Sequence, residues 1–144
     1  MKVIFLNVDG VLTHSEQENY PNYDLMEEKV MLVKQICEAT GAKVVMNSVW
    51  VKLKKVYDPL LEIFNKNGIE IIDESKRCCF GTSYDDAIKE WLNENPVESF
   101  VILNDDDCYW DERGLSSNLV QTNFYDGGLK PEHVVKAIEI LSKI

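Results

Sequence analysis

The chain has 144 residues, of which 45% are hydrophobic and 28% charged, as is typical of one soluble globular domain and not of a disordered segment. Its formal net charge of −10 disfavours unaided binding to nucleic-acid phosphates and to anionic membranes. No apolar run reaches the roughly 20 residues of a membrane span, and no signal-peptide layout precedes the first apolar run. We therefore expect a single cytoplasmic domain over residues 1–144, without a membrane partner.

The first predicted strand lies at the N-terminus. Residues 3–6 form a β-branched and aromatic apolar run, which is typical of a strand buried on both faces. Asn7 and Asp9 follow, two positions apart and so able to face one ligand together, and Gly10 lets the chain turn away. Because ligands of open α/β sheets bind at the carboxyl ends of the strands, we expect these three residues in a binding crevice.

A polar stretch dotted with aromatic residues, from Thr13 to Asp24, comes next. A loop of this length inside a compact domain is more often functional than not. The alternative is a solvated connection to the first helix.

The rest of the chain alternates helical and extended patterns. This alternation predicts βαβ units, and hence a single-domain, Rossmann-like α/β fold with a mostly parallel sheet of about five strands and helices on both faces. Right-handed crossovers then place all strand ends on one edge. The expected strands after the first are 43–47, 69–72, 99–103 and 119–122, and the expected helices are 25–40, 53–65, 85–93 and 131–144.

An acidic run follows the strand expected at 99–103. It comprises Asn104, Asp105, Asp106 and Asp107. Most charge runs are solvated turns. Carboxylates gathered at a strand end repel one another unless a cation relieves them, however, and oxygen ligands suit Mg²⁺. Since the first strand also ends in polar residues, we favour a magnesium site.

The N-terminal segment resembles the first motif of the haloacid dehalogenase (HAD) superfamily of phosphatases, an apolar strand followed by Asp-x-Asp-Gly-[Thr/Val]-Leu. The resemblance implies that the first Asp attacks phosphorus, that the second is the general acid/base, and that Mg²⁺ screens the charge. Here Asn7 stands at the nucleophile position and Asp9 at the general acid/base position. A neutral amide lacks the nucleophilic carboxylate and is a weaker ligand for a hard cation.

The acidic run resembles the fourth HAD motif, an apolar strand closing in two acids. Either Asn104 or Asp105 occupies the first acidic place, which leaves the register open by one residue. The metal ligands implied by the resemblance are Asn7, Asp9, Asn104, Asp105 and Asp106.

Further parts of the resemblance concern the bound phosphate. Asn47 and Ser48 resemble the second motif, in which a hydroxyl holds the phosphoryl group, and the local string is similar to the Ser-Ser-x-Trp-Arg of a small HAD subgroup linked to RNA repair. Val51 stands where that pattern has Arg. Lys76 and Arg77 are candidates for the cation of the third motif, with surface charge as the alternative, and Gly10 completes the expected substrate-binding set.

The resemblance also implies a capless form, because only a short flap at about 13–24 fits where larger cap domains are inserted. Capless members have open sites that suit large substrates, including proteins and nucleic-acid ends. We therefore expect a phosphorylated substrate, with a macromolecule as one option. The oligomeric state is not predicted.

Two functions follow from these observations. The first is a Mg²⁺-dependent phosphomonoester hydrolase scaffold that works through an aspartyl-phosphate, with Asn7 leaving this chain inactive or trapped. The second is a natural pseudo-phosphatase that binds a phosphorylated ligand or a protein, which the departures at Asn104 and Val51 support. A third option, a receiver-like phosphoacceptor, needs an aspartate where Asn7 stands.

Aromatic and cysteine residues complete the expectations. Aromatic residues that include Tyr20 and Trp50 are expected near the rim of the crevice, where they could form a wall for a base or a side chain. The four cysteines form no Cys-x-x-Cys pair, so we expect reduced thiols. The carboxylates beside Cys108 should raise the pKa of its thiol and make it a poor nucleophile.

Overall fold

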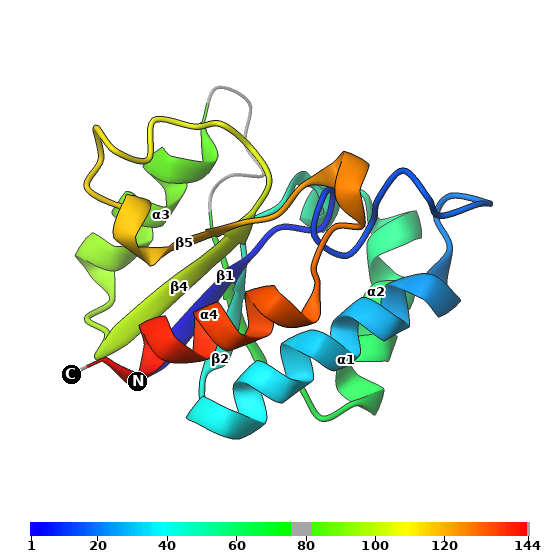
Figure 1. Cartoon of the computed structure of the whole chain (residues 1–144), viewed down its shortest axis with the longest axis horizontal. Helices are drawn as coiled ribbons and strands as arrows, with labels where there is room; N and C mark the ends of the chain where they lie inside the picture. Colours follow the sequence, from blue (N-terminus) through cyan, green and yellow to red (C-terminus); the bar gives the residue numbers. More distant parts are fainter. Residues whose placement is uncertain (76–81, 144) are drawn as a thin grey trace.

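A computed structural model of the chain describes residues 1–75 and 82–143. Five parallel strands form one sheet in the order β3-β2-β1-β4-β5 (Figure 1). Among the described residues, an α-helix follows each of the first three strands along the chain, and a fourth α-helix follows β5. The strands are β1 (Lys2–Leu6), β2 (Lys43–Met46), β3 (Ile71–Glu74), β4 (Ser99–Asn104) and β5 (Leu119–Gln121). The α-helices are α1 (Tyr23–Thr40), α2 (Lys54–Lys66), α3 (Tyr84–Glu94) and α4 (Pro131–Ser142), and a short 3₁₀ helix, η1 (Val49–Lys52), precedes α2.

Strand β1 is the centre of the sheet and of both hydrophobic cores. Its side chains alternate between the two faces, so Ile4 and Leu6 join one core while Val3 and Phe5 join the other. Because both faces are covered, the strand is apolar at every position from 3 to 6, as a buried parallel strand requires.

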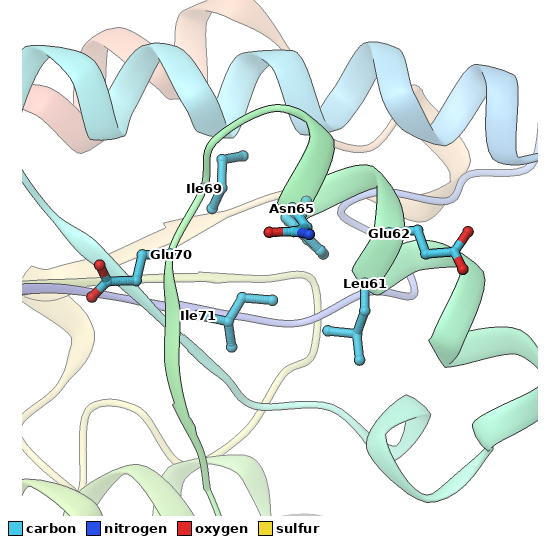
Figure 2. Close-up of a pocket in the computed structure, with 7 residues that line it drawn as sticks. Leu61, Glu62, Asn65, Ile69, Glu70 and Ile71 are labelled. Carbon is cyan, nitrogen blue, oxygen red and sulfur yellow. The ribbon is translucent and has the colours of Figure 1, made fainter.

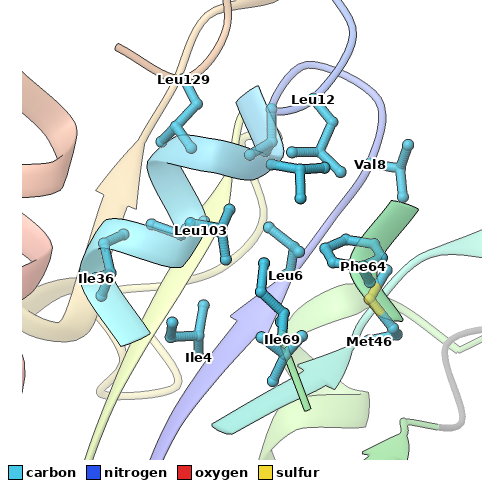
Figure 3. Close-up of a cluster of buried hydrophobic side chains, with 14 of the residues drawn as sticks. Ile4, Leu6, Val8, Leu12, Ile36, Met46, Phe64, Ile69, Leu103 and Leu129 are labelled. Carbon is cyan, nitrogen blue, oxygen red and sulfur yellow. The ribbon is translucent and has the colours of Figure 1, made fainter. Parts of the chain in front are cut away.

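Of the α-helices that the structure describes, three cover one face of the sheet and one covers the other. Helices α1, α2 and α4 pack on the face of Ile4 and Leu6, and Figure 3 shows Ile36 of α1 and Phe64 of α2 in this cluster. On the opposite face, α3 contributes Trp91, whose ring meets that of Phe5 edge-on with centroids 5.4 Å apart. The expected α/β fold with helices on both faces is therefore confirmed.

The predicted elements are found with small differences at their ends. Pro131 opens α4 as expected, and α1 ends at Thr40, where the Gly41 N–H donates to the carbonyl of Cys37. The third strand was expected at 69–72, but it begins two residues later, at Ile71. The reason is that Ile69 lies in the turn that closes the end of α2, since its N–H donates to the carbonyl of Phe64.

Both ends of the described chain lie at the amino ends of the strands (Figure 1). The carbonyl of Met1 accepts a hydrogen bond from the Glu98 N–H at 2.7 Å, and the Ser99 hydroxyl donates to the carbonyl of Leu141 at 2.8 Å. The start of β1 and the end of α4 therefore meet at the start of β4. Within the described ranges, no helix is long and apolar enough to cross a membrane.

Candidate functional site

The carboxyl ends of the five strands carry a row of uncharged polar side chains. The backbone ladder continues past the strands: the Asn7 N–H donates to the carbonyl of Leu103 at 3.1 Å, and the Asn47 N–H donates to that of Leu6 at 2.8 Å. This continuation holds neighbouring residues of different strands side by side. In the order of the strands, the row is Ser75, Asn47, Asn7, Asn104 and Thr122, all buried.

Asn7 and Asn104 form an amide pair at the centre of this row. The Asn7 Nδ2 group donates to Asn104 Oδ1 at 3.3 Å and to the backbone carbonyl of Asp9 at 3.0 Å. The Asp106 N–H donates to the same Asn104 Oδ1 at 2.9 Å. The structure thus places the predicted nucleophile position against Asn104, and not against one of the acids that follow it.

Two atoms of the row are buried without a hydrogen-bond partner in the described part of the chain. They are Asn104 Nδ2 and Asn47 Oδ1. The other end of the Asn47 amide is used, because its Nδ2 donates to the Ser75 hydroxyl at 2.7 Å. A buried polar atom left unpaired costs about 1–3 kcal/mol, so the row carries a cost in stability at both atoms.

The carboxylate of Asp9 is held by three donors from separate segments. The hydroxyls of Tyr20 and Thr13 donate to Asp9 Oδ1 at 2.8 and 3.1 Å, and the indole of Trp50 donates to Oδ2 at 3.1 Å. The rings of Tyr20 and Trp50 also meet edge-on, with centroids 6.3 Å apart. Burial, and then the hydrogen bond to Asp9, raise the pKa of Tyr20 above its usual range, so its phenol remains a donor.

Gly10 permits a close approach of the acidic run to the first motif. Its φ of 82° lies in the left-handed region, and a Cβ at this position would lie 2.0 Å from Asp105 Cγ. The Thr122 hydroxyl donates to the carbonyl of Gly10 at 2.6 Å, which ties the same turn to the end of β5. Gly10 is therefore required by packing inside the site.

In the acidic run, Asp105 is packed against the site, whereas Asp106 and Asp107 face the solvent. Burial, and then the charges of Asp106, Asp9 and Asp107, raise the pKa of Asp105, which is half-buried against Gly10. Asp106 and Asp107 are exposed, and Gln121 of β5 donates to Asp107 Oδ1 at 2.8 Å. The Cys108 thiol donates to Asp106 Oδ1 at 3.2 Å. Burial, and then this carboxylate, raise the pKa of Cys108 to about 12, in the direction that the sequence predicted.

Ser48 acts as a helix cap. Its hydroxyl accepts a hydrogen bond from the Trp50 N–H at 3.2 Å at the start of η1, and the side chain is buried. Val51, which stands where the resemblance expects Arg, is buried in the main core. Lys76 and Arg77, the two candidate phosphate cations, lie outside the described residues.

Hollows lie both at the row and away from it. The first, of about 480 Å³, is bordered by Asp105, Asp107, Thr122 and Tyr125. The second, of about 440 Å³, lies between α2 and the β3 edge, and Figure 2 shows Leu61, Ile69 and Ile71 around it. The hollow at α2 contains none of the predicted site residues.

The row does not fit a divalent cation as its atoms are arranged. Asn7 points a donor, and not an oxygen, at the Asp9 carbonyl and at Asn104 Oδ1. In residues 1–75 and 82–143, no group of three or more His, Cys, Asp or Glu side chains is placed to hold a metal ion. Mg²⁺ bound by protein needs oxygen ligands in nearly ideal octahedral geometry, together with negative charge, and the pair supplies neither.

Sequence reasoning missed three residues of the site, Ser75, Thr13 and Thr122. Ser75 directly follows β3, which was expected to end at residue 72. Thr13 reaches Asp9, and its signal is a hydroxyl four residues after that acid, with a glycine between them to turn the chain. Thr122 follows β5 at the same edge, so extending the rule for strand ends to the fifth strand would have found it.

A comparison with known families gives a match over most of the chain. The sequence model of the family described as "HAD domain in Swiss Army Knife RNA repair proteins" matches residues 3–134. No curated protein and no solved structure matches the chain. The match spans β1 to the start of α4 and therefore includes the whole row at the strand ends.

Proposed function

Because the chain belongs to the family of HAD domains in Swiss Army Knife RNA repair proteins, we propose that it is a pseudo-phosphatase, a phosphomonoester hydrolase scaffold that binds its ligand without hydrolysing it. The observation that carries the proposal is the buried amide of Asn7 at the nucleophile position, hydrogen-bonded to Asn104. An amide oxygen is a poor nucleophile, so no acyl-phosphate forms at residue 7.

The chemistry that the scaffold would support becomes clear from an Asn7→Asp form. The new carboxylate would attack phosphorus in line, and the bond from phosphorus to the leaving alcohol would break. Asp9 would give its proton to the leaving oxygen, and would then take a proton from the water that attacks the aspartyl-phosphate. Tyr20, Thr13 and Trp50, which donate to Asp9 in the present chain, would have to release it for these transfers.

Several departures together favour a natural binding domain over an enzyme disabled at one position. Asn104 is neutral and faces Asn7, which removes charge from the two central positions at once. Val51, which stands where the resemblance expects Arg, is buried in the core, so this departure is not an exchange of one surface residue. A single engineered change would explain Asn7 alone.

The ligand is expected to be a phosphorylated end and not a length of nucleic acid. The family description associates these domains with RNA repair proteins. The net charge of −10 opposes contact along a phosphate backbone. A terminal phosphomonoester at the edge of the sheet satisfies both observations. Fluorescence anisotropy should show tighter binding of a 3′-phosphorylated RNA oligonucleotide than of its 3′-hydroxyl counterpart.

The test of the pseudo-phosphatase proposal is turnover of p-nitrophenyl phosphate, with and without Mg²⁺. Three proteins are compared: the chain itself, Asn7→Asp, and Asn7→Asp combined with Asn104→Asp. We expect no turnover by the chain and Mg²⁺-dependent turnover by the double variant, since loss of a nucleophile typically costs on the order of 10⁴- to 10⁶-fold in rate. Mass spectrometry under denaturing conditions should detect a phosphoryl group only on the variants.

Turnover by the unaltered chain at a rate close to that of the double variant would overturn the proposal. Equal anisotropy for the two oligonucleotides would leave the absence of catalysis intact but would contradict the phosphorylated ligand.

A further inference from the structure

The Asn7 amide joins two residues that the resemblance implies as Mg²⁺ ligands. Its Nδ2 group lies 3.0 Å from the backbone carbonyl of Asp9 and 3.3 Å from Asn104 Oδ1. We propose that this amide group takes the place of the ion, so that the strand ends of this domain are joined without a divalent metal.

The hydrogen bonds of the pair leave little for a cation. An amide oxygen has two lone pairs, and both of those on Asn104 Oδ1 are engaged, one by Asn7 Nδ2 and the other by the Asp106 N–H at 2.9 Å. The two hydrogens on Asn7 Nδ2 are matched in turn by two acceptors. Asn7 Nδ2 and Asn104 Oδ1 are thus both fully used, while Asn104 Nδ2, which is a donor and cannot bind a cation, has no partner in the described part of the chain.

The charge of the pair supports the same conclusion. Asn7 and Asn104 are both neutral and both buried. Mg²⁺ gives up its water reluctantly and is held by carboxylates that compensate for this loss. Two neutral amides provide no such compensation, whereas the partial positive charge of an amide N–H group is enough to bridge two neutral oxygens.

The carboxylates of Asp9 and Asp105 lie near the amide pair but make their contacts with other groups. Asp9 accepts from Tyr20, Thr13 and Trp50 through both of its oxygens. Asp105 packs against Gly10, at the position that a Cβ of residue 10 would need. Neither is hydrogen-bonded to the amide pair through its carboxylate, so neither restores charge to it.

The experiment measures cation binding and not activity. Its result can therefore contradict this inference without contradicting the proposed function. Mn²⁺ is titrated into the chain, and free Mn²⁺ is followed by electron paramagnetic resonance. The same titration is made with Asn7→Asp/Asn104→Asp, which replaces both amides by carboxylates. Asn93→Asp, at an exposed position of α3, is the control for added negative charge.

We expect the chain and Asn93→Asp to bind Mn²⁺ alike and weakly, through surface carboxylates. The double variant should gain one site that is roughly tenfold tighter or more. Its melting temperature should rise with Mg²⁺, while that of the chain and of Asn93→Asp should stay nearly constant. If the double variant fails to fold, Asn7→Asp alone should lose thermal stability in EDTA and regain it with Mg²⁺.

A tight Mn²⁺ site in the unaltered chain that weakens in Asn7→Ala would overturn the inference. So would a folded double variant that gains no site, because the amide would then not occupy the position of an ion. A chain that binds Mn²⁺ tightly yet fails to hydrolyse p-nitrophenyl phosphate would contradict this inference alone and leave the pseudo-phosphatase proposal standing.

Discussion

Residue 10 is glycine because the carboxylate of Asp105 occupies the space that a larger side chain would need. Its φ is positive, and the space that a Cβ would take is filled by Asp105. Gly68 has a similar φ of 73° but nothing within 4 Å of the same position. Comparing alanine substitutions at Gly10 and Gly68 therefore separates the energetic cost of a positive φ from the cost of the clash with Asp105.

Gly10→Ala should reduce the free energy of unfolding by about 3 kcal/mol, because strain of the left-handed backbone and a clash inside the site add together. Gly68→Ala should cost about 1 kcal/mol, from the backbone alone. Urea denaturation of both variants measures the difference. Equal losses would mean that Asp105 moves aside freely and that the contact with Gly10 has no structural weight.

Tyr20 fastens the loop after the first motif to Asp9. Removing its hydroxyl in Tyr20→Phe should cost about 1 kcal/mol, which is less than is usual for a hydrogen bond to a charged group because Tyr20 is 56% exposed. Limited proteolysis should show faster cleavage between residues 13 and 22. Tyr125→Phe, at a tyrosine that is 81% exposed, is the control and should alter neither stability nor cleavage. Unchanged proteolysis in Tyr20→Phe would contradict a fastening role.

The site residues that could be predicted from the sequence are those that stand at the ends of strands. Asn7, Asn47 and Asn104 were predicted together because parallel strands share a carboxyl edge. Thr13 and Trp50 were not assigned to Asp9, because their approach depends on how a turn and a 3₁₀ helix fold back over the edge. Such contacts between segments leave no periodic signal in the sequence.

At the scale of elements, apolar periodicity predicted every strand and α-helix among the described residues. The exception is the start of β3, which lies two residues later than predicted because of a tertiary contact. Ile69 fits the apolar pattern of a strand, but it is buried against the end of α2. A strand pattern records which residues are buried, not which neighbour buries them.

The segment after β4 is fastened to α3 by an ion pair that the sequence did not predict. Arg113 Nε lies 3.3 Å from Asp85 Oδ2, and the same guanidinium meets Asp86. Asp85 is 1% exposed and its Oδ1 has no partner in the described chain, so Arg113 is its main compensation.

Arg113→Ala should cost about 2 kcal/mol, less than a fully buried pair because the arginine is 47% exposed. Much of that loss arises because Arg113→Ala leaves the buried Asp85 carboxylate without a cation. The loss of stability should therefore be smaller when Arg113→Ala is made in an Asp85→Asn background. Urea denaturation of the four proteins of this cycle gives the coupling. The same loss in both backgrounds would show that Arg113 acts through packing and not through charge.

At the scale of the whole molecule, charge is the dominant constraint. With 25 acidic and 15 basic residues, the folded chain repels itself at neutral pH. The melting temperature should therefore rise by roughly 2–5 °C when NaCl is increased from about 20 to about 300 mM, since salt screens exposed charges. Glu139→Lys, at an exposed position of α4, should reduce this dependence. A melting temperature that falls with salt would mean that surface ion pairs outweigh the repulsion.

The meeting of the two chain ends at the start of β4 has a practical consequence for how the protein can be held. Both ends emerge at the amino ends of the strands, while the amide row lies at their carboxyl ends. A tether attached through residue 1 or beyond residue 143 would pull on the side of the sheet away from the row. Surface immobilisation by either end, or a circular permutant that joins them with a short linker, should leave the edge that carries the amide row facing solution.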